Sequence, residues 1–188
     1  MNVYDFDNTI YKGESVVDFY LFLLKKDFSL IRLMPKVLSV LIRYKRCIIS
    51  GDELLQIAED YALEVLEAIP DIDAYVKEFW DKNQHKIKDF YKKQQREDDV
   101  ILSASCGFLL RDICGRLGIK NVLATEIDIE KVKIKRICFK NAKPEIFKEQ
   151  FGECEIDNFY TDSMNDKPMF DYAKNVYIVK HDKITKLK

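Results

Sequence analysis

The fold is decided at residues 2–9, which read NVYDFDNT. The β-branched and aromatic residues of this stretch predict a strand over residues 2–6, and two carboxylates, Asp5 and Asp7, stand at its carboxyl end. Open parallel sheets bind ligands beyond the carboxyl ends of their strands. The two carboxylates share one face of an ideal strand, so their repulsion raises one pKa unless a cation or the turn separates them. Mg2+ is the hard cation whose preferred ligands match this pair.

Further strands are expected at residues 99–104, 121–125, 157–161 and 175–179. Residues 107–117 and 144–151 read as helices between them, and residues 132–138 fit one arm of a β-hairpin. Strands and helices that alternate in this way imply right-handed crossovers and a parallel sheet that is covered on both faces. The sequence therefore predicts an α/β core.

Residues 14–95 interrupt this alternation with amphipathic helical patterns and no convincing strand. We expect a helical subdomain inserted there, and a core formed by residues 1–13 and 96–188. Within the insertion, residues 71–96 read as one long helix with a polar face.

A second pair of carboxylates, Asp162 and Asp166, follows the strand expected at residues 157–161. Ser103 lies at the end of another expected strand, and Lys143 precedes a helix. Because the carboxyl ends of parallel strands meet at one edge of a sheet, that edge gathers carboxylates, a hydroxyl donor and a cation. The sequence predicts a site that binds an anion beside a metal ion.

The 188 residues, 47% of them hydrophobic, suffice for one compact domain with an insertion. The formal net charge of -1 gives no overall attraction to nucleic acid, and we expect no nucleic-acid partner.

The five cysteines form no Cys-x-x-Cys pair, and the chain has only two histidines, so a zinc site is disfavoured. Reduced thiols in a cytoplasm fit this composition. The acidic start lacks the features of a signal peptide and no apolar run can span a bilayer, so we expect a soluble cytoplasmic protein.

Four motifs occur in order along the chain: Asp5-x-Asp7-x-Thr9, Ser103 after an apolar strand, Lys143 before a helix, and Asp162-Ser163-x-x-Asp166. They resemble the four ordered motifs of the haloacid dehalogenase superfamily, and the resemblance covers nearly the whole chain. The helical insertion after the first motif resembles the type-one cap of the branch that includes phosphoserine phosphatase. The resemblance implies an α/β fold of three layers, with a Rossmann-like parallel sheet core and an inserted helical cap.

The resemblance also implies a phosphoric monoester hydrolase that acts on a small phosphorylated metabolite. Asp5 would be the nucleophile that forms an aspartyl phosphate, and Asp7 would protonate the leaving oxygen and then activate water. Ser103 and Lys143 would bind phosphoryl oxygens. The acid at Asp7 argues against dehalogenation, in which no leaving oxygen needs a proton.

By the same resemblance, Mg2+ would be bound by Asp5, the backbone carbonyl of Asp7, and Asp162. Asp166 would orient Asp162, Lys143 or a metal-bound water. The supporting residues would be Thr9, which braces the loop, Ser163 and Asp166.

The donor and the cation of the second and third motifs each have an alternative. Phosphoserine phosphatases usually place two glycines after the serine of the second motif, whereas this chain reads Ser103-Ala104-Ser105-Cys106. Ser105 replaces Ser103 as the donor if the strand ends later than expected, and Lys148 is the alternative to Lys143. We favour Ser103 and Lys143.

Candidate substrate-binding residues are Glu14, Ala104, Arg43 and Arg46. The position of Glu14 resembles that of the acidic residue with which phosphoserine phosphatases bind the ammonium group of the substrate. The alternative is that its charge favours the start of a helix. Residues 25–46 carry a charge of +6, from seven basic residues and one acidic residue. A solvated basic face is the default interpretation, and attraction of an anionic substrate or contact with anionic lipid at a membrane surface are the alternatives.

The expected function is thus a Mg2+-dependent phosphatase for a small phosphomonoester. One alternative is a phosphotransferase, in which an alcohol replaces water in the second step. Another is a catalytically idle, membrane-associated binding protein on the same fold, and the presence of every motif carboxylate argues against it. The sequence leaves the physiological substrate and the oligomeric state open.

Overall fold

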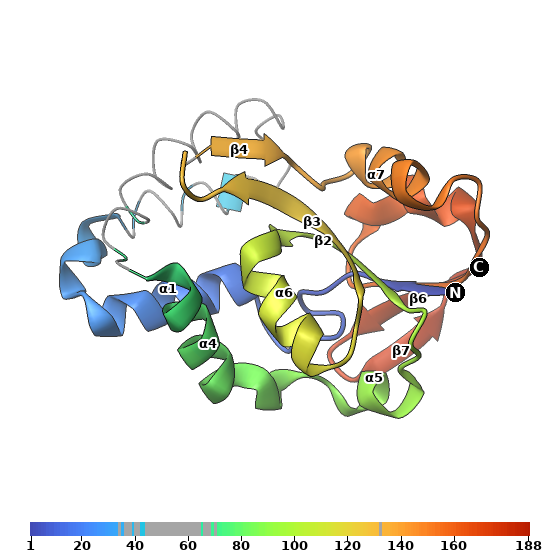
Figure 1. Ribbon diagram of the computed structural model, residues 1–188. Coiled ribbons are helices and arrows are strands. Elements are labelled where there is room, and N and C mark those ends of the chain that lie inside the picture. Colours follow the sequence, from blue (N-terminus) through green and yellow to red (C-terminus); the bar gives the residue numbers. More distant parts are fainter. Residues whose placement is uncertain are drawn as a thin grey trace.

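The computed structural model describes residues 1–33, 35, 39, 42–43, 65, 69, 71–131 and 133–188. Seven strands in these residues form one sheet in the order β4-β3-β2-β1-β5-β6-β7 (Figure 1). Their bounds are β1 Asn2–Tyr4, β2 Val100–Cys106, β3 Asn121–Asp128, β4 Lys133–Arg136, β5 Ile156–Thr161, β6 Ala173–Lys180 and β7 Lys183–Lys186. Neighbouring strands from β3 to β6 pair in parallel, whereas β4 and β7 are antiparallel edges.

The predicted α/β fold is confirmed, but its sheet is not wholly parallel. β4 pairs with β3 as the hairpin arm that the sequence indicates at residues 132–138. The sequence does not predict β7, because most of its four residues are exposed and Ile184 is its one apolar side chain. Antiparallel strands at the two edges leave the central parallel strands, and the carboxyl end of β1, in the middle of the sheet.

Two hydrophobic clusters cover the two faces of the sheet. Tyr4 belongs to the cluster that includes the apolar residues of α6 (Gly107–Arg116). Val3 belongs to the other cluster, with the apolar residues of α7 (Ala142–Phe151) and of the 3-10 helix η3 (Met164–Tyr172). β1 is therefore buried on both faces, as a central strand of a parallel sheet must be. This arrangement gives the three predicted layers.

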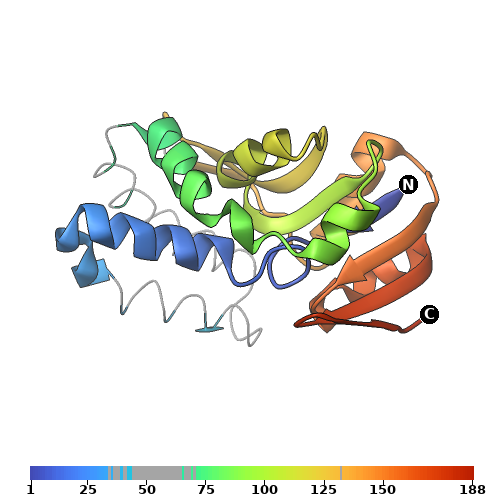
Figure 2. The same cartoon turned by 90° about the horizontal axis from the view of Figure 1, so that it is seen from below.

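The described residues between β1 and β2 include the helices α1 (Ser15–Lys26), η1 (Phe28–Leu33), α4 (Ile72–Asn83), η2 (Gln84–Lys86) and α5 (Asp89–Gln94). α1 and α4 lie side by side, on the side of the molecule away from the two termini (Figures 1 and 2). The ring of Phe19 in α1 meets that of Phe79 in α4 edge to face, with centroids 5.3 Å apart. Trp80 Nε1 donates a hydrogen bond to the carbonyl of Leu109 in α6 (2.7 Å), which ties α4 to a helix of the core. The division of the chain at residues 14 and 95 remains a prediction.

The single long helix predicted over residues 71–96 is wrong. After α4 the chain passes through η2 and an extended pair, Ile87 and Lys88, before α5 begins. The cause is a tertiary contact, since Lys88 N donates to the carbonyl of Ile10 (2.8 Å) and Ile87 pairs with Tyr11. These bonds satisfy the extended backbone and outweigh the local helix preference. Neither these helices nor any other in the described part of the chain is long and apolar enough to cross a membrane.

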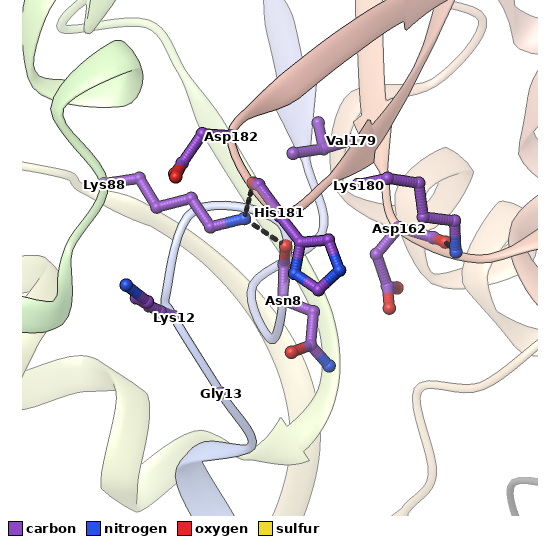
Figure 3. Close-up of a pocket in the computed structure, with 9 residues that line it drawn as sticks. All are labelled: Asn8, Lys12, Gly13, Lys88, Asp162, Val179, Lys180, His181 and Asp182. Atoms are coloured by element: carbon purple, nitrogen blue, oxygen red, sulfur yellow. Dashed lines mark hydrogen bonds between the residues drawn. The ribbon is translucent and has the colours of Figure 1, made fainter.

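Lys88 links the loop after β1 to the turn between β6 and β7. The residue is buried, and its Nζ donates to the carbonyl oxygens of Asn8 (2.5 Å) and His181 (2.6 Å) (Figure 3). Asn8 and His181 have positive φ angles of 57° and 53°, so both acceptors belong to turns in the left-handed region. Burial lowers the pKa of Lys88, although the charges of Asp182 and Asp162 oppose the change. The ammonium group thus fixes the two turns to each other.

We predict that Lys88→Met destabilises the fold by about 1–3 kcal/mol, because two carbonyl oxygens lose their buried donor. Urea unfolding of the variant and the parent protein measures this change. The matched control is Lys92→Met in α5, because Lys92 pairs with Asp89 at the surface (Nζ to Oδ1, 3.5 Å) and such pairs contribute less than about 1 kcal/mol. Equal unfolding midpoints for the two variants would show that the link between the turns is energetically neutral.

Candidate active site

Asp5 lies directly beyond β1 and beside a buried lysine. Its backbone N–H donates to the carbonyl of Tyr160 in β5 (2.9 Å), which continues the sheet pairing past the end of β1. Lys143, in the first turn of α7, places Nζ 3.0 Å from Asp5 Oδ1 and 2.7 Å from Asp166 Oδ1. Thr161 Oγ1 donates to Asp166 Oδ2 (2.7 Å) and so holds the second carboxylate. Asp5, Lys143 and Asp166 form a buried ionic cluster at the carboxyl ends of β1 and β5.

Burial and the neighbouring charges shift the pKa values of Asp5 and Lys143. Burial raises the pKa of Asp5 to about 8; the ammonium of Lys143 opposes the change, and the charges of Asp166, Asp162 and Asp7 add to it. Burial acts to lower the pKa of Lys143, but the charges of Asp166 and Asp5 outweigh burial and raise it. Lys143 therefore stays cationic at neutral pH, next to the carboxylate expected to be the nucleophile. A phosphoryl group that approaches Asp5 meets a fixed positive charge.

Both carboxylate oxygens of Asp7 accept hydrogen bonds. Oδ1 accepts from the backbone N–H of Ser15, the first residue of α1 (2.7 Å), and Oδ2 accepts from the hydroxyl of Ser105 in β2. The hydroxyls of Ser15 and Ser105 are 3.2 Å apart. Burial raises the pKa of Asp7 to about 6, the hydrogen bond from Ser105 opposes the shift, and the charge of Glu14 adds to it. A carboxyl with this pKa can exist in both protonation states near neutral pH, as an acid and base in one reaction cycle must.

The second motif lies inside β2 and not at its end. β2 continues to Cys106, beyond the end expected at Ala104, and its pairing with β3 shifts between Leu102 and Cys106. Ser103 is buried, and its Oγ accepts a hydrogen bond from the N–H of Ser105 (3.1 Å). The carbonyl of Ala104 accepts from Thr125 Oγ1 of β3 (2.7 Å). Both candidate serines therefore lie within the second half of β2, and Ser105 is the one in contact with Asp7.

The loop between β1 and α1 is held by polar side chains. Thr9 Oγ1 donates to Asp5 Oδ2 (3.3 Å), which agrees with the bracing role that the resemblance implies. Asn8 Nδ2 donates to Glu14 Oε1 (2.5 Å), so the Glu14 carboxylate lies against the loop that carries Asp7. Glu14 directly precedes α1, and its own side chain makes no hydrogen bond to the start of that helix.

Asp162 follows β5 and lines a cavity of about 270 Å³ beside the first motif. Figure 3 shows its carboxylate facing the same space as Asn8 and the His181 ring, while Lys180 Nζ donates to the Asp162 carbonyl (2.5 Å). Ser163 is not among the residues that line this cavity, and its Oγ accepts a hydrogen bond from the N–H of Asn165 (3.1 Å) and caps η3. The first and fourth motifs thus border the same cavity.

The donors at this edge suit Mg2+ better than a metal that needs a full set of protein ligands. The described residues contain no group of three or more His, Cys, Asp and Glu that could hold a metal by themselves. Mg2+ needs fewer, since it keeps several waters and takes one or two carboxylates. The pKa of Asp5 is raised partly by the Asp162 charge, so a cation between these carboxylates would relieve a repulsion that the structure contains. The side chain of Asp7 is held by Ser15 and Ser105, which leaves its backbone carbonyl as the expected ligand.

The structure does not place every candidate residue at the site, and it adds one residue, Ser15, that the sequence analysis did not select. Lys148, the alternative to Lys143, is partly exposed on α7 and pairs with Glu153 (2.9 Å). Arg43 is half-buried within the insertion, where its role remains a prediction, and Arg46 lies outside the described residues. Ser15 is the site residue that the sequence did not single out. A helix start next to Glu14 signals free N–H groups that attract carboxylates, but sequence alone does not identify the carboxylate.

Comparisons with known proteins give a family and a fold. The family model for haloacid dehalogenase-like hydrolases matches residues 3–171. No curated protein matches the chain significantly. A solved structure of a protein of unknown function from Bordetella pertussis Tohama I has a TM-score of 0.74 at 18% identity, over 94% of this chain and 87% of that chain.

Two further solved structures have the same architecture. A phosphoserine phosphohydrolase-like protein from Francisella tularensis subsp. tularensis SCHU S4 has a TM-score of 0.63 at 19% identity, over 94% of this chain and 86% of that chain. A HAD family hydrolase from Salmonella enterica subsp. enterica serovar Typhi has a TM-score of 0.59 at 12% identity, over 91% of this chain and 59% of that chain. At these identities the likeness shows a shared fold.

We predict that Lys143→Met destabilises the protein by about 3–5 kcal/mol, because it leaves two buried carboxylates without a counter-charge. The double variant Lys143→Met/Asp166→Asn should recover part of this loss, since a single carboxylate then remains. Urea unfolding of the single and double variants measures the coupling. Lys148→Met is the control on the same helix, with an expected loss below about 1 kcal/mol. Similar losses for Lys143→Met and Lys148→Met would contradict the buried ionic cluster.

Proposed function

The chain belongs to the haloacid dehalogenase-like hydrolase family, and we propose that it is a Mg2+-dependent phosphatase that hydrolyses a small phosphomonoester through an aspartyl phosphate on Asp5. The observation that carries the proposal is the buried Asp5 carboxylate, 3.0 Å from the Lys143 ammonium, at the carboxyl end of a central strand. A carboxylate nucleophile beside a fixed cation is suited to attack on an anionic phosphoryl group.

In the first step, an oxygen of Asp5 attacks phosphorus and the bond to the leaving oxygen breaks. Lys143 neutralises charge on the phosphoryl group, and its position is fixed by Asp166. Asp7 gives its proton to the leaving oxygen. In the second step, Asp7 removes a proton from water, and the water oxygen displaces Asp5 from phosphorus, which releases inorganic phosphate. Ser103 is the proposed hydroxyl donor to a phosphoryl oxygen.

The residues proposed to hold Mg2+ are Asp5, Asp162 and the backbone carbonyl of Asp7. When bound, the ion would neutralise charge on the transferred phosphoryl group and hold it in line with Asp5. Thr9 keeps the second oxygen of Asp5 in place (3.3 Å), and Ser163 fixes the turn that follows Asp162. If an alcohol enters in place of water, the same residues catalyse phosphoryl transfer, so inorganic phosphate is the product that distinguishes hydrolysis from transfer.

We predict that the purified protein releases inorganic phosphate from 4-nitrophenyl phosphate in the presence of Mg2+ and loses this activity in EDTA. Asp5→Asn keeps the size of the side chain but removes the nucleophile, so we expect turnover to fall by on the order of 10³-fold or more while the fold remains. Phosphate release and circular dichroism are the two measurements. Full activity in EDTA, or parental turnover by Asp5→Asn, would refute the proposal.

A carboxylate near the phosphoryl site favours a substrate that carries an amine. Glu14 lies within hydrogen-bond distance of Asn8 in the catalytic loop, and its charge raises the pKa of Asp7, which supports a position close to the leaving group. We therefore include phosphoserine-like compounds among the proposed substrates. The basic side chains of the insertion, Arg43 and Arg46 among them, are the proposed partners of a substrate carboxylate.

We predict that Glu14→Gln lowers kcat/KM for phosphoserine by about 10–100-fold more than for 4-nitrophenyl phosphate, because it removes a charge-assisted contact to the ammonium group. Gln keeps an oxygen that can accept the hydrogen bond from Asn8, so the loop contact is retained. Steady-state kinetics on both substrates give the ratio. Equal losses on the two substrates would assign Glu14 to support of the loop and would end the amine hypothesis.

A further inference from the structure

The side chain of Ser105 contacts the carboxylate that the proposed reaction uses as its acid. Its hydroxyl donates to Asp7 Oδ2, whereas the Ser15 N–H donates to the other oxygen, Oδ1. A carboxylate offers about four lone-pair directions, two on each oxygen, and Asp7 accepts from the Ser105 hydroxyl, from the N–H of Ser15 and also from the side chain of Ser15. One direction is left, on which a protonated Asp7 can carry its hydrogen toward a leaving oxygen.

The orientation of the Asp7 carboxylate needs both donors. The torsion that turns an aspartate carboxylate about its Cβ–Cγ bond is broad, so a single hydrogen bond leaves the plane of the group poorly defined. The two donors come from different elements, since Ser15 begins α1 and Ser105 belongs to β2. Together they fix the carboxylate plane relative to the sheet, and removal of Ser105 leaves only the contacts from Ser15, at the start of α1.

Ser105 is itself held in place. The residue is buried, its N–H donates to Ser103 Oγ (3.1 Å), and its Oγ lies 3.2 Å from Ser15 Oγ. Its β2 neighbour Ala104 is anchored to β3 through Thr125 Oγ1 (2.7 Å). The N–H of Ser105 and the carbonyl of its neighbour Ala104 are thus both hydrogen-bonded, and a hydroxyl held in this way on a central strand can support another side chain.

We propose that Ser105 is a positioning residue that holds the Asp7 carboxyl in the orientation from which it protonates the leaving oxygen. This inference rests on the proposed function, in which Asp7 is the acid. In the step concerned, the bond from Asp5 to phosphorus forms, the bond from phosphorus to the leaving oxygen breaks, and the proton of Asp7 moves to that oxygen. A leaving group that is stable as an anion departs without this proton. The effect of Ser105 must therefore grow as the leaving group becomes poorer.

The test compares kcat/KM for 4-nitrophenyl, phenyl and 4-methoxyphenyl phosphate, which have similar size and leave with decreasing ease. General-acid catalysis contributes about 10²–10⁴-fold, and a misdirected acid loses part of it. We expect Ser105→Ala to lose roughly 10–30-fold on the two poorer substrates and less than about threefold on 4-nitrophenyl phosphate. Asp7→Asn removes the acid altogether, so its loss of kcat/KM on the two poorer substrates, relative to 4-nitrophenyl phosphate, is the upper limit for the corresponding loss in Ser105→Ala.

Two further variants separate positioning from a general effect on the fold. Ser105→Cys keeps the volume of the side chain but donates weakly, so it should show the same selective loss even if Ser105→Ala folds poorly. Thr125→Val removes a buried hydroxyl from the neighbouring strand, one that binds the carbonyl of Ala104 and not Asp7, so its losses should be equal on all three substrates. Thermal unfolding reports the stability of each variant.

The outcomes distinguish this inference from the function on which it rests. A steeper dependence on the leaving group in both Ser105→Ala and Ser105→Cys supports positioning of the acid. Equal losses on all three substrates, in variants of an active parent protein, overturn the role of Ser105 and leave the phosphatase proposal intact. Absence of Mg2+-dependent turnover by the parent protein overturns both.

Discussion

A lysine ammonium buried between two carboxylates is the constraint on which the rest of the site depends. Lys143 is 1% exposed, and removal of an ammonium from water costs several kcal/mol unless charged partners lie within hydrogen-bond distance. Asp5 and Asp166 supply them at 3.0 and 2.7 Å. The three residues come from the end of β1, the first turn of α7 and η3. The cluster can form only when the sheet and the α7 layer have assembled, so folding of the core and assembly of the site are coupled.

The expected insertion, residues 14–95, is joined to the sheet by more than its covalent connections. Ile10 lies before it and Lys88 lies near its end, and these two residues share a backbone hydrogen bond (2.8 Å). The Lys88 side chain then reaches the carbonyls of Asn8 and His181, in the first-motif loop and the turn after β6. Two turns with left-handed residues would otherwise expose carbonyls at the edge of the cavity. One buried cation therefore organises the connections of the insertion, as Lys143 organises the carboxylates.

The sequence predicts the parts of this protein that follow from local pattern. Alternating strands and helices indicate the α/β core, and polar residues after apolar strands indicate Asp5 and Asp162. Lys143, which the sequence places just before a helix, lies in the first turn of α7, where it precedes the buried Ile146 and Phe147 by three and four residues and so shares their face. The break of the long helix at Ile87 could not be predicted in this way, since its cause is pairing with a segment some 75 residues earlier. The contact between Ser105 and Asp7 is likewise tertiary, with 98 positions between the partners.

The two carboxylates of the first motif depend on different parts of the molecule, although only one residue separates them. Both charged partners in the ionic cluster of Asp5, Lys143 in α7 and Asp166 in η3, lie outside α1, so this cluster does not require α1 to be in place. Asp7 is different, because Oδ1 is held by the first N–H of α1 and Oδ2 by Ser105 of the core. A displacement of α1 removes the first bond and leaves the second. In the proposed reaction, the transfer of the proton from Asp7 therefore depends on α1 resting against β2, whereas the contacts of Asp5 with Lys143 do not.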